Sequence, residues 1–504
     1  MNPEKQYRFR YIGNKPKDFI NGLAQLRKAY EDSRTAQLKR QEEDDKPKDI
    51  EKIEEAIICS GDRDSLNVAG FGYYPLWLNS ETAALSEGQY KEIMACVKTL
   101  YILPDIDSTG IRASLRLGMK FLDIRFIWLP DSLATFKDNR GKPRKDLRDY
   151  VELYPSISDF KKLVNVAMPL QFWDMVTREE GIKYYLNDEH ALFFLHANGF
   201  GKIEYKNKRD YFVWVRDNMV KEVQAEEIKD FTLNFLKDRY LPIPLRNVVR
   251  KPNQLSEATL KGLPKLNIDF TDFDQFSQYL FFRNKTILVT GSEIRELRPG
   301  DSNRFAWEEK VIQRNFKILP DQFKITRNED TGQYDIEIFN YDSKFFCYLI
   351  NASRVHWQTE LEGRLDCKDE EFKRKYIADH RFSIDGELLN EEEIQEQKEH
   401  LINKMFSIGY LLHQYKNKAR PWAVYAIDNK ISADGESHGR SGKSFCYSSL
   451  NLFKKSVTLP GRNPEITKNP HIYDRVTEYT DIVLVDDADQ YLPFEFFYDT
   501  ITGL

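Results

Sequence analysis

Short apolar runs alternate with amphipathic segments in the first third of the chain. After a charged, helix-forming lead at 26–54, four apolar runs have the length of buried strands and lie at 56–59, 74–78, 100–103 and 124–128. Two segments between them, 86–97 and 109–119, carry apolar residues at helical spacing. Strands that alternate with helices predict a parallel, doubly wound sheet, which binds its ligands at the carboxyl ends of the strands.

The pattern changes after residue 155. Short aromatic, strand-like runs precede a predicted helix at 225–237, and strand-like alternation recurs at 334–340. A long amphipathic helix is predicted at 391–415, with apolar residues on one face. Two further apolar runs near the C-terminus, 421–427 and 481–487, predict buried strands. These features indicate a mixed α+β region followed by a second α/β domain.

Length and composition allow several domains. A chain of 504 residues with 41% hydrophobic residues has room for about three domains with cores of their own. We predict a charged helical lead at 1–53 and an α/β domain at 54–155. A mixed α+β connecting region at 156–390 and a second α/β domain at 391–504 follow.

Composition also excludes several classes of protein. No apolar run reaches membrane-spanning length and the N-terminal residues lack a signal-peptide core, so we predict a cytoplasmic protein without a membrane partner. The five cysteines form no C-x-x-C pair, which argues against a zinc ribbon or a disulfide framework. The net charge of −5 argues against a globally basic nucleic-acid coat but allows local basic surfaces.

A glycine-containing loop at 434–444 follows the apolar run 421–427. Successive backbone N–H groups can surround a phosphate only where glycines allow close approach. Lys443 is therefore expected to contact the β and γ phosphates, and the Ser444 hydroxyl to ligate Mg²⁺ at the start of a helix. The residues predicted to bind the nucleotide are Gly439, Arg440, Ser441, Gly442, Lys443, Ser444 and Phe445. The first glycine of the usual phosphate-loop pattern is replaced by Ser437.

A pair of acids ends the apolar run 481–487. Asp486 is expected to hold Mg²⁺ through water, and Asp487 to polarise the attacking water. An ordinary surface turn followed by a strand end could produce each motif alone, but both occur together and in the expected order. The sequence therefore predicts ATP hydrolysis with Mg²⁺, in which Lys443 and Asp487 act as the catalytic residues.

Paired aspartates follow the predicted strands of the first domain. Asp105 and Asp107 follow the third strand as Asp-x-Asp, which places two carboxylates on one side of an extended segment. The remaining acids follow strands one and four and are Asp62, Asp64, Asp146 and Asp149. Aspartates at strand ends also serve as helix caps and turn formers. We predict a divalent-metal site that includes Asp62, Asp105 and Asp107.

The residues at 56–65, 103–114, 127–130 and 145–150 together resemble the Toprim domain of bacterial-type primases and topoisomerases. The resemblance covers about residues 54–155 and implies that these acids bind divalent metals used in phosphoryl transfer. Asp105 and Asp107 match the family's Asp-x-Asp, and Gly61 matches the glycine of its Glu-Gly pair. The family's glutamate falls on Ser60. This change removes the candidate general acid/base unless Asp62 or Asp64 substitutes for it.

Residues 155–504 resemble the helicase part of phage and mobile-element primase-helicases, similar to superfamily 3 and related pox-virus proteins. The resemblance rests on residues 200–205, 212–215 and 281–290 and on the two ATPase motifs. It implies an AAA+-type motor that forms homo-oligomeric rings on single-stranded or forked DNA. Such a motor needs a polar sensor strand and an arginine after the second motif, so the chain is expected to be incomplete. We also expect the zinc-binding and primer-synthesising parts of a full primase to be absent.

The sequence therefore predicts a phage or mobile-element DNA replication protein, with a degenerate Toprim module before an ATP-dependent DNA helicase motor. Its cofactors would be ATP and Mg²⁺. Mg-ATP binding with weak hydrolysis by the chain alone is expected. One alternative is a Toprim-type, metal-dependent DNA nuclease coupled to an ATPase. Another is a noncatalytic replication scaffold in which both sites are vestigial.

Overall fold

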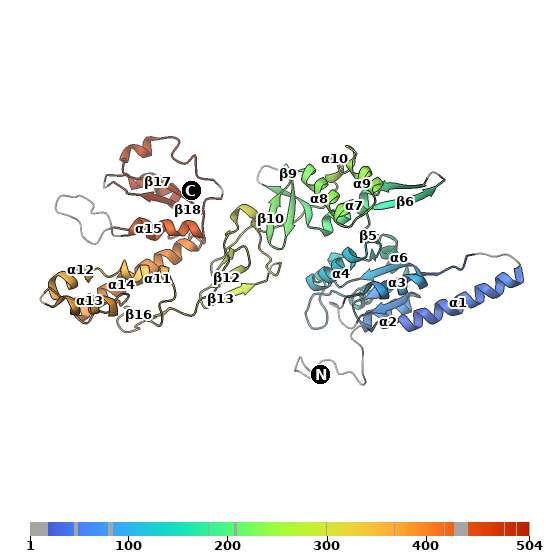
Figure 1. The fold of residues 1–504 in the computed structure, drawn as a ribbon, viewed down its shortest axis with the longest axis horizontal. Helices are drawn as coiled ribbons and strands as arrows, with labels where there is room; N and C mark the ends of the chain where they lie inside the picture. Colours follow the sequence, from blue (N-terminus) through green and yellow to red (C-terminus); the bar gives the residue numbers. More distant parts are fainter. Residues whose placement is uncertain are drawn as a thin grey trace, which may run out of the picture. The chain divides into compact units, whose positions relative to one another are not determined.

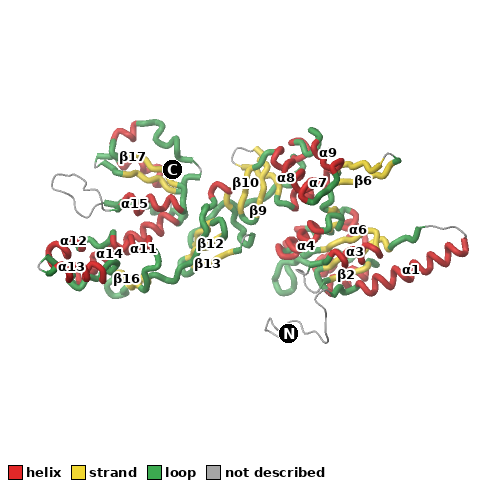
Figure 2. Tube along the Cα trace, in the orientation of Figure 1, coloured by secondary structure: helices red, strands yellow, loops and turns green. Residues whose placement is uncertain are grey.

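The protein divides into two compact units. Unit 1 comprises residues 1–214 and 222–267, and unit 2 comprises residues 215–221 and 268–504. The boundary near residue 268 lies inside the stretch 156–390 that the sequence predicts as one connecting region. The computed structural model (Figures 1 and 2) describes residues 19–44, 49–78, 84–179, 181–205, 209–298, 300–366, 368–417, 419–427, 442–477, 479–489 and 491–502.

Unit 1 begins with a five-stranded sheet of order β2-β1-β3-β4-β5. Strands β1 to β4 pair in parallel, and β5 joins the edge antiparallel. The strands are β1 (Ile53–Cys59), β2 (Tyr74–Trp77), β3 (Val97–Leu103), β4 (Arg125–Phe126) and β5 (Met168–Pro169). All four predicted strands are present, and their parallel pairing confirms the predicted sheet. The chain reverses its direction of winding between β1 and β3, and such a switch point opens a ligand crevice.

Helices cover both faces of this sheet because its strands are apolar on both sides. Ile57 and Leu103 pack toward one face with residues of α2, α5 and α6. Ile58 and Leu100 pack toward the other face with residues of α1 and α3 and the partly buried side of α4. The helices are α1 (Leu23–Asp44), α2 (Asp62–Gly70), α3 (Glu87–Cys96), α4 (Ser108–Lys120), α5 (Leu147–Leu153) and α6 (Ile157–Asn165). The sequence predicted α3 and α4, and it predicted a helical lead that is observed as α1.

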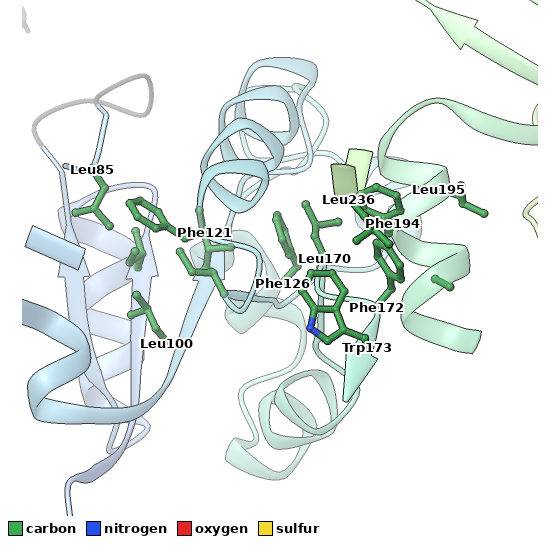
Figure 3. Close-up of a cluster of buried hydrophobic side chains, with 14 of the residues drawn as sticks. Leu85, Leu100, Phe121, Phe126, Leu170, Phe172, Trp173, Phe194, Leu195 and Leu236 are labelled. Carbon is green, nitrogen blue, oxygen red and sulfur yellow. The ribbon is translucent and has the colours of Figure 1, made fainter. Parts of the chain in front are cut away.

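The core of the sheet continues into the second half of unit 1 (Figure 3). Phe126 of the sheet, Phe172 and Phe194 belong to one buried cluster. The ring centroids of Phe172 and Phe194 lie 4.6 Å apart. The remaining elements of this half are β6 (Trp173–Arg178), β7 (Gly181–Leu186), α7 (Asp188–Ala197), β8 (Phe200–Tyr205), β9 (Arg209–Arg216), α8 (Ala225–Asp238), α9 (Ile243–Arg250) and α10 (Glu257–Leu260). The helix predicted at 225–237 is confirmed as α8.

Unit 2 begins with small sheets. β10 pairs in parallel with β14, β11 to β13 form an antiparallel sheet, and β15 and β16 form a hairpin. These strands are β10 (Met219–Glu222), β11 (Ser277–Phe281), β12 (Thr286–Thr290), β13 (Ile294–Leu297), β14 (Ala306–Trp307), β15 (Phe323–Arg327) and β16 (Tyr334–Ile338). The alternation at 334–340 is thus confirmed as a strand.

Helices and one parallel strand pair complete unit 2. α11 (Lys344–Asn351), α14 (Glu391–Leu412) and α15 (Lys443–Ser448) share a buried cluster that includes Phe346, Leu401 and Cys446. α12 (Trp357–Thr359) and α13 (Glu370–Asp379) lie between α11 and α14 in the chain. β17 (Ser456–Pro460) pairs in parallel with β18 (Ile482–Asp486), and α16 (Tyr498–Thr502) follows. The helix predicted at 391–415 and the strand predicted at 481–487 are therefore confirmed.

The strand predicted at 421–427 is not formed. Trp422, Tyr425 and Ile427 are 58%, 68% and 64% exposed, and the structure assigns no strand to this stretch. An apolar run becomes a strand only where a neighbouring strand offers backbone partners, and periodicity does not reveal that neighbour. In the described part of the chain, no helix is long and apolar enough to cross a membrane.

Candidate functional site

Five aspartates gather at the carboxyl ends of β1 and β3, where the winding of the sheet reverses. We call them the acid centre: Asp64, Asp105, Asp107, Asp146 and Asp149. Asp64 lies in the first turn of α2, directly after β1, and Asp105 and Asp107 follow β3. Asp146 caps α5 and accepts a hydrogen bond from the Asp149 amide at 2.8 Å. The switch point therefore places these acids where a doubly wound sheet binds its ligands.

Lys145 joins the two acids of the Asp-x-Asp motif. Its ammonium Nζ lies 3.2 Å from Asp105 Oδ2 and 2.6 Å from Asp107 Oδ2. Asp107 also caps α4 by accepting the Gly110 amide at 2.8 Å. Burial alone would raise the pKa of Asp107, but the bonds from Gly110 and Lys145 hold it below its usual range. The hydrogen bond to Asp107 raises the pKa of Lys145.

The other acids have less compensation. Asp64 is only 6% exposed and accepts the Arg148 amide at 3.2 Å. Burial, followed by the negative charges of Asp146 and Asp105, raises the pKa of Asp64 to about 7. Burial also raises the pKa of Asp146, although the Asp149 amide partly opposes this. The acid centre therefore concentrates negative charge that a bound cation would neutralise.

Ser60 links the ends of β1 and β3. Its hydroxyl accepts the Asp105 amide at 3.2 Å and lies 3.4 Å from the Leu103 carbonyl, to which it donates. Ser60 thus orients the loop that carries Asp105. Asp62, predicted as a metal ligand, is exposed in the first turn of α2, where its carboxylate accepts the Arg63 amide at 3.0 Å. The structure brings Asp64 toward Asp105 and Asp146, and leaves Asp62 on the surface.

The donors of the acid centre suit a hard divalent cation. Carboxylate oxygens are ligands that Mg²⁺ prefers. Burial, and then the negative charges of Asp146 and Asp105, raise the pKa of Asp64, and a bound cation would oppose both effects. Within the described residues, no group of three or more His, Cys, Asp or Glu side chains is already arranged to hold a metal. Lys145 lies between Asp105 and Asp107, so an ion at that pair would share or displace its ammonium.

The described part of the predicted phosphate loop begins at Gly442, whereas Gly439, Arg440 and Ser441 lie outside the described residues. Gly442 has φ of 81°, a conformation that favours glycine, and directly precedes α15. The Ser444 hydroxyl donates to Asp486 Oδ1 at 2.9 Å. Residues 42 positions apart are thereby brought together as the sequence predicts.

Asp487 lies just beyond the end of β18. It has φ of 53°, which is uncommon for a residue with a side chain. Its carboxylate is 61% exposed and lies 3.4 Å from Nε of Arg462. The Gly461 amide donates to the Asp486 carbonyl at 2.7 Å and fixes the strand end from the other side. Such unusual backbone conformations are enriched at functional sites.

Tyr348 of α11 contacts Gly442 and Phe445 at the start of α15, and the sequence does not predict these contacts. Its hydroxyl donates to the Gly442 carbonyl at 2.6 Å, and its ring packs edge-on against Phe445 at 4.7 Å. A Cβ atom on Gly442 would lie 2.4 Å from the Tyr348 oxygen. The apolar run 345–350 gave no signal for this role. Lys145 was also missed, although it belongs to the stretch that carries the Toprim resemblance.

Comparison with known proteins gives structural similarity only. No protein-family model and no curated protein matches the chain. One similar structure is a DnaG catalytic core, with a TM-score of 0.27 and 13% identity over 46% of this chain and 55% of that one. The E. coli primase catalytic core has a TM-score of 0.27 and 14% identity, over 50% of this chain and 59% of that one. A primase domain from Pseudomonas aeruginosa has a TM-score of 0.24 and 15% identity, over 40% of this chain and 49% of that one. The matches span less than two thirds of each of these chains.

Proposed function

We propose that the chain is a primase-like DNA replication protein, in which a Toprim-like domain and an ATP-binding phosphate-loop domain act on the same DNA. The observation that carries the DNA-acting part is the acid centre at the switch point of the parallel sheet. Asp64, Asp105 and Asp146 converge there from three separate segments. Converging carboxylates with little compensation are typical of metal-dependent phosphoryl transfer.

In this proposal Asp105 and Asp107 hold a divalent ion, and Asp64 and Asp146 supply further negative charge around it. The ion, when bound, supplies positive charge to the oxygens of a nucleic-acid phosphate. Ser60 keeps the Asp105 loop in place through its hydrogen bond to the Asp105 amide. Lys145 contacts the same two carboxylates. Once the ion shares these contacts, the Lys145 ammonium would supply a second positive charge to the same phosphate.

The hydroxyl of Ser60 stands where the Toprim family has a glutamate, and it cannot act as a carboxylate base. We therefore propose that the acid centre binds metal and DNA phosphate but synthesises primers weakly or not at all. This is the degenerate Toprim module that the sequence predicts. The phosphate-loop domain then carries the energy-consuming step.

A specific contact supports ATP binding by unit 2. The Ser444 hydroxyl and the Asp486 carboxylate, 2.9 Å apart, are the two groups that share Mg²⁺ in phosphate-loop ATPases. In the proposal Lys443 contacts the β and γ phosphates, and Asp487 polarises the attacking water. A helicase motor that assembles as a homo-oligomeric ring on single-stranded or forked DNA is the corresponding activity.

The test of this part is calorimetric titration of the full chain with Mg-ATP, next to Lys443→Ala. We expect binding in the micromolar range that weakens at least 100-fold in the variant, equivalent to about 2.7 kcal/mol. Equal binding by the two proteins would contradict the ATP-binding proposal. DNA-stimulated hydrolysis is then measured on the protein that binds.

A metal-dependent DNA nuclease is the second candidate, because hydrolysis needs carboxylates that could hold a divalent ion but no primer-extending site. The retention of Asp64, Asp105, Asp107 and Asp146 beside Ser60 favours it. Incubation with end-labelled DNA and Mn²⁺ separates the two candidates. Cleavage that disappears in Asp105→Asn would establish the nuclease, whereas intact DNA supports the primase-like proposal.

A further inference from the structure

A strongly basic segment, residues 136–148, lies next to the acid centre. It contains six basic and two acidic residues, a local charge of +4 in a chain whose net charge is −5. We call it the basic segment. Its basic residues are Lys137, Arg140, Lys142, Arg144, Lys145 and Arg148. Four of these side chains pair with acids of unit 1: Arg140 with Asp138, Arg144 and Arg148 with Glu152, and Lys145 with Asp105 and Asp107. The positive charge available to an anionic partner is therefore that of Lys137 and Lys142.

Backbone hydrogen bonds give the first part of the segment a defined shape. The Arg144 amide donates to the Phe136 carbonyl at 3.0 Å, and the Asp138 amide donates to the Lys142 carbonyl at 2.8 Å. Gly141, with φ of 74°, makes the turn between them. The Asp138 carboxylate accepts two backbone amides inside the turn, from Arg140 and Lys142. The cations are therefore displayed on a formed hairpin, which lowers the entropy cost of binding.

The far end of the segment is fastened to the acid centre. The Ile106 amide donates to the Lys145 carbonyl at 3.0 Å, between the two acids of the Asp-x-Asp motif. The Lys145 amide donates to Asp149 Oδ2 at 2.8 Å, and the Arg148 amide donates to Asp64 Oδ1 at 3.2 Å. A ligand that follows the hairpin therefore arrives at the acid centre.

Exposure divides the segment into structural and available groups. The Arg144 side chain is 11% exposed and contacts Glu152 at 2.7 Å, so it serves the fold. Lys137 and Lys142 are exposed, and no ion pair is described for either among the residues that the structure covers. Phe136 is 45% exposed at the base of the same hairpin. Cations beside an exposed aromatic ring are the combination that holds single-stranded nucleic acid.

We propose that the basic segment binds the backbone of a single-stranded nucleic acid, with Phe136 stacking on a base, and delivers the strand to the acid centre. Lys137 and Lys142 contact consecutive phosphates on the hairpin, and Lys145 meets the phosphate that reaches the acids. The inference rests on the proposed function for what happens at the acid centre. The binding step itself needs neither metal nor ATP.

The test is fluorescence anisotropy of a labelled oligonucleotide with the full chain, in EDTA and without nucleotide. The double variant Lys137→Gln/Lys142→Gln is compared with Lys39→Gln/Lys161→Gln, which makes the same charge change at exposed positions elsewhere in unit 1. We expect the hairpin variant to bind about tenfold more weakly. Its salt dependence should fall by about 1.4 in log-log slope, from two lost phosphate contacts. The control should stay within about twofold of the native chain.

Phe136→Ala tests the stacking step separately. We expect about fivefold weaker binding of single strands with an unchanged salt slope, because stacking releases no counterions. DNA and RNA oligonucleotides of one sequence show which sugar the surface accepts. Equal weakening by the control double variant, or no weakening by the hairpin variant, would overturn the proposal. So would a duplex that binds as tightly as the single strand. Because EDTA removes all divalent ions, these results are independent of whether the acid centre holds metal.

Discussion

The acid centre of unit 1 and the paired acids Asp486 and Asp487 of unit 2 hold their carboxylates in opposite ways. Asp64 and Asp105 are buried at 6% and 5% exposure, among other carboxylates and against Lys145. Asp487 is 61% exposed and contacts a side chain, Arg462, that is itself 88% exposed. The first site is built into the core of its sheet, whereas the second lies at the open end of a two-stranded pair.

The difference shows where each site obtains its order. The acids of unit 1 are fixed before any ligand arrives, so their mutual repulsion is present in the free protein. Asp487 of unit 2 instead remains exposed to water, and we propose that a nucleotide with its metal would order this site. Substitutions of the acids in the acid centre should therefore change folding stability and metal affinity together. Substitutions in unit 2 should change nucleotide affinity with little effect on stability.

The largest effect expected in the acid centre is on folding stability, from Asp64→Asn. The pKa of Asp64 is about 7 in the folded chain, above its unfolded value of about 3.9, so the folded state holds the proton more tightly. Folding stability should therefore fall as pH rises from about 4 to about 7, and stay low above that. Asparagine does not ionise, so the variant should not lose folding stability at this position as the pH rises. We expect Asp64→Asn to be more stable than the native chain by on the order of 2 kcal/mol at about pH 8 in EDTA.

The measurement is urea unfolding of unit 1 within the full chain, at about pH 4.5 and about pH 8. At about pH 4.5, Asp64 is protonated in the folded state and mostly ionised in the unfolded state. That pH lies only slightly above the unfolded pKa of about 3.9, so most of the stability loss has not yet developed and the gain should largely vanish. A gain that is the same at both values would contradict the burial of a charged Asp64.

The next effect is on metal affinity, from Lys145→Met. In the native chain the Lys145 ammonium lies within 3.2 Å of both acids of the Asp-x-Asp motif, so it would compete with a divalent ion for them. We expect Mn²⁺ to bind about tenfold more tightly to Lys145→Met, measured by calorimetry without nucleotide. Lys161→Met, an exposed substitution on α6, serves as the control for net charge. Weaker Mn²⁺ binding by Lys145→Met would instead show that Lys145 assembles the centre.

The smallest effect is expected from Tyr348→Phe. The substitution removes the hydroxyl that donates to the Gly442 carbonyl at 2.6 Å and keeps the ring against Phe445. A hydrogen bond of this kind contributes about 0.5–1.5 kcal/mol, so we expect Mg-ATP to bind about threefold more weakly. Tyr90→Phe in unit 1 should leave ATP affinity unchanged. An unchanged affinity in Tyr348→Phe would show that α11 does not position the loop.

The parallel sheet could be predicted because short stretches of the sequence are enough to show the alternation of strands and helices. Asp105 could be predicted as a site residue because the Asp-x-Asp motif directly follows a strand that its apolar run predicts. The choice between Asp62 and Asp64 could not be made, because it depends on the direction in which the first turn of α2 presents each side chain. The helix starts at Asp62 and turns that residue outward, while Asp64 is buried.

Contacts between distant segments limited the rest of the prediction. Lys145 reaches Asp107 across 38 positions, and Tyr348 reaches Gly442 across 94. Neither contact can be recognised from the spacing or the hydrophobicity of residues along the chain. The strand predicted at 421–427 failed for a related reason, since no partner strand is visible in the periodicity of the run itself.

The most direct test of the two proposed cation sites is the count of Mn²⁺ ions bound by the full chain, measured by electron paramagnetic resonance with and without ATP. We compare the native protein with Asp105→Asn and Lys443→Ala. We expect one site without ATP, which is lost in Asp105→Asn and kept in Lys443→Ala. A second site should appear with ATP and be lost in Lys443→Ala. Mn²⁺ binding without ATP that is unaffected by Asp105→Asn would contradict the claim that the acid centre is a cation site.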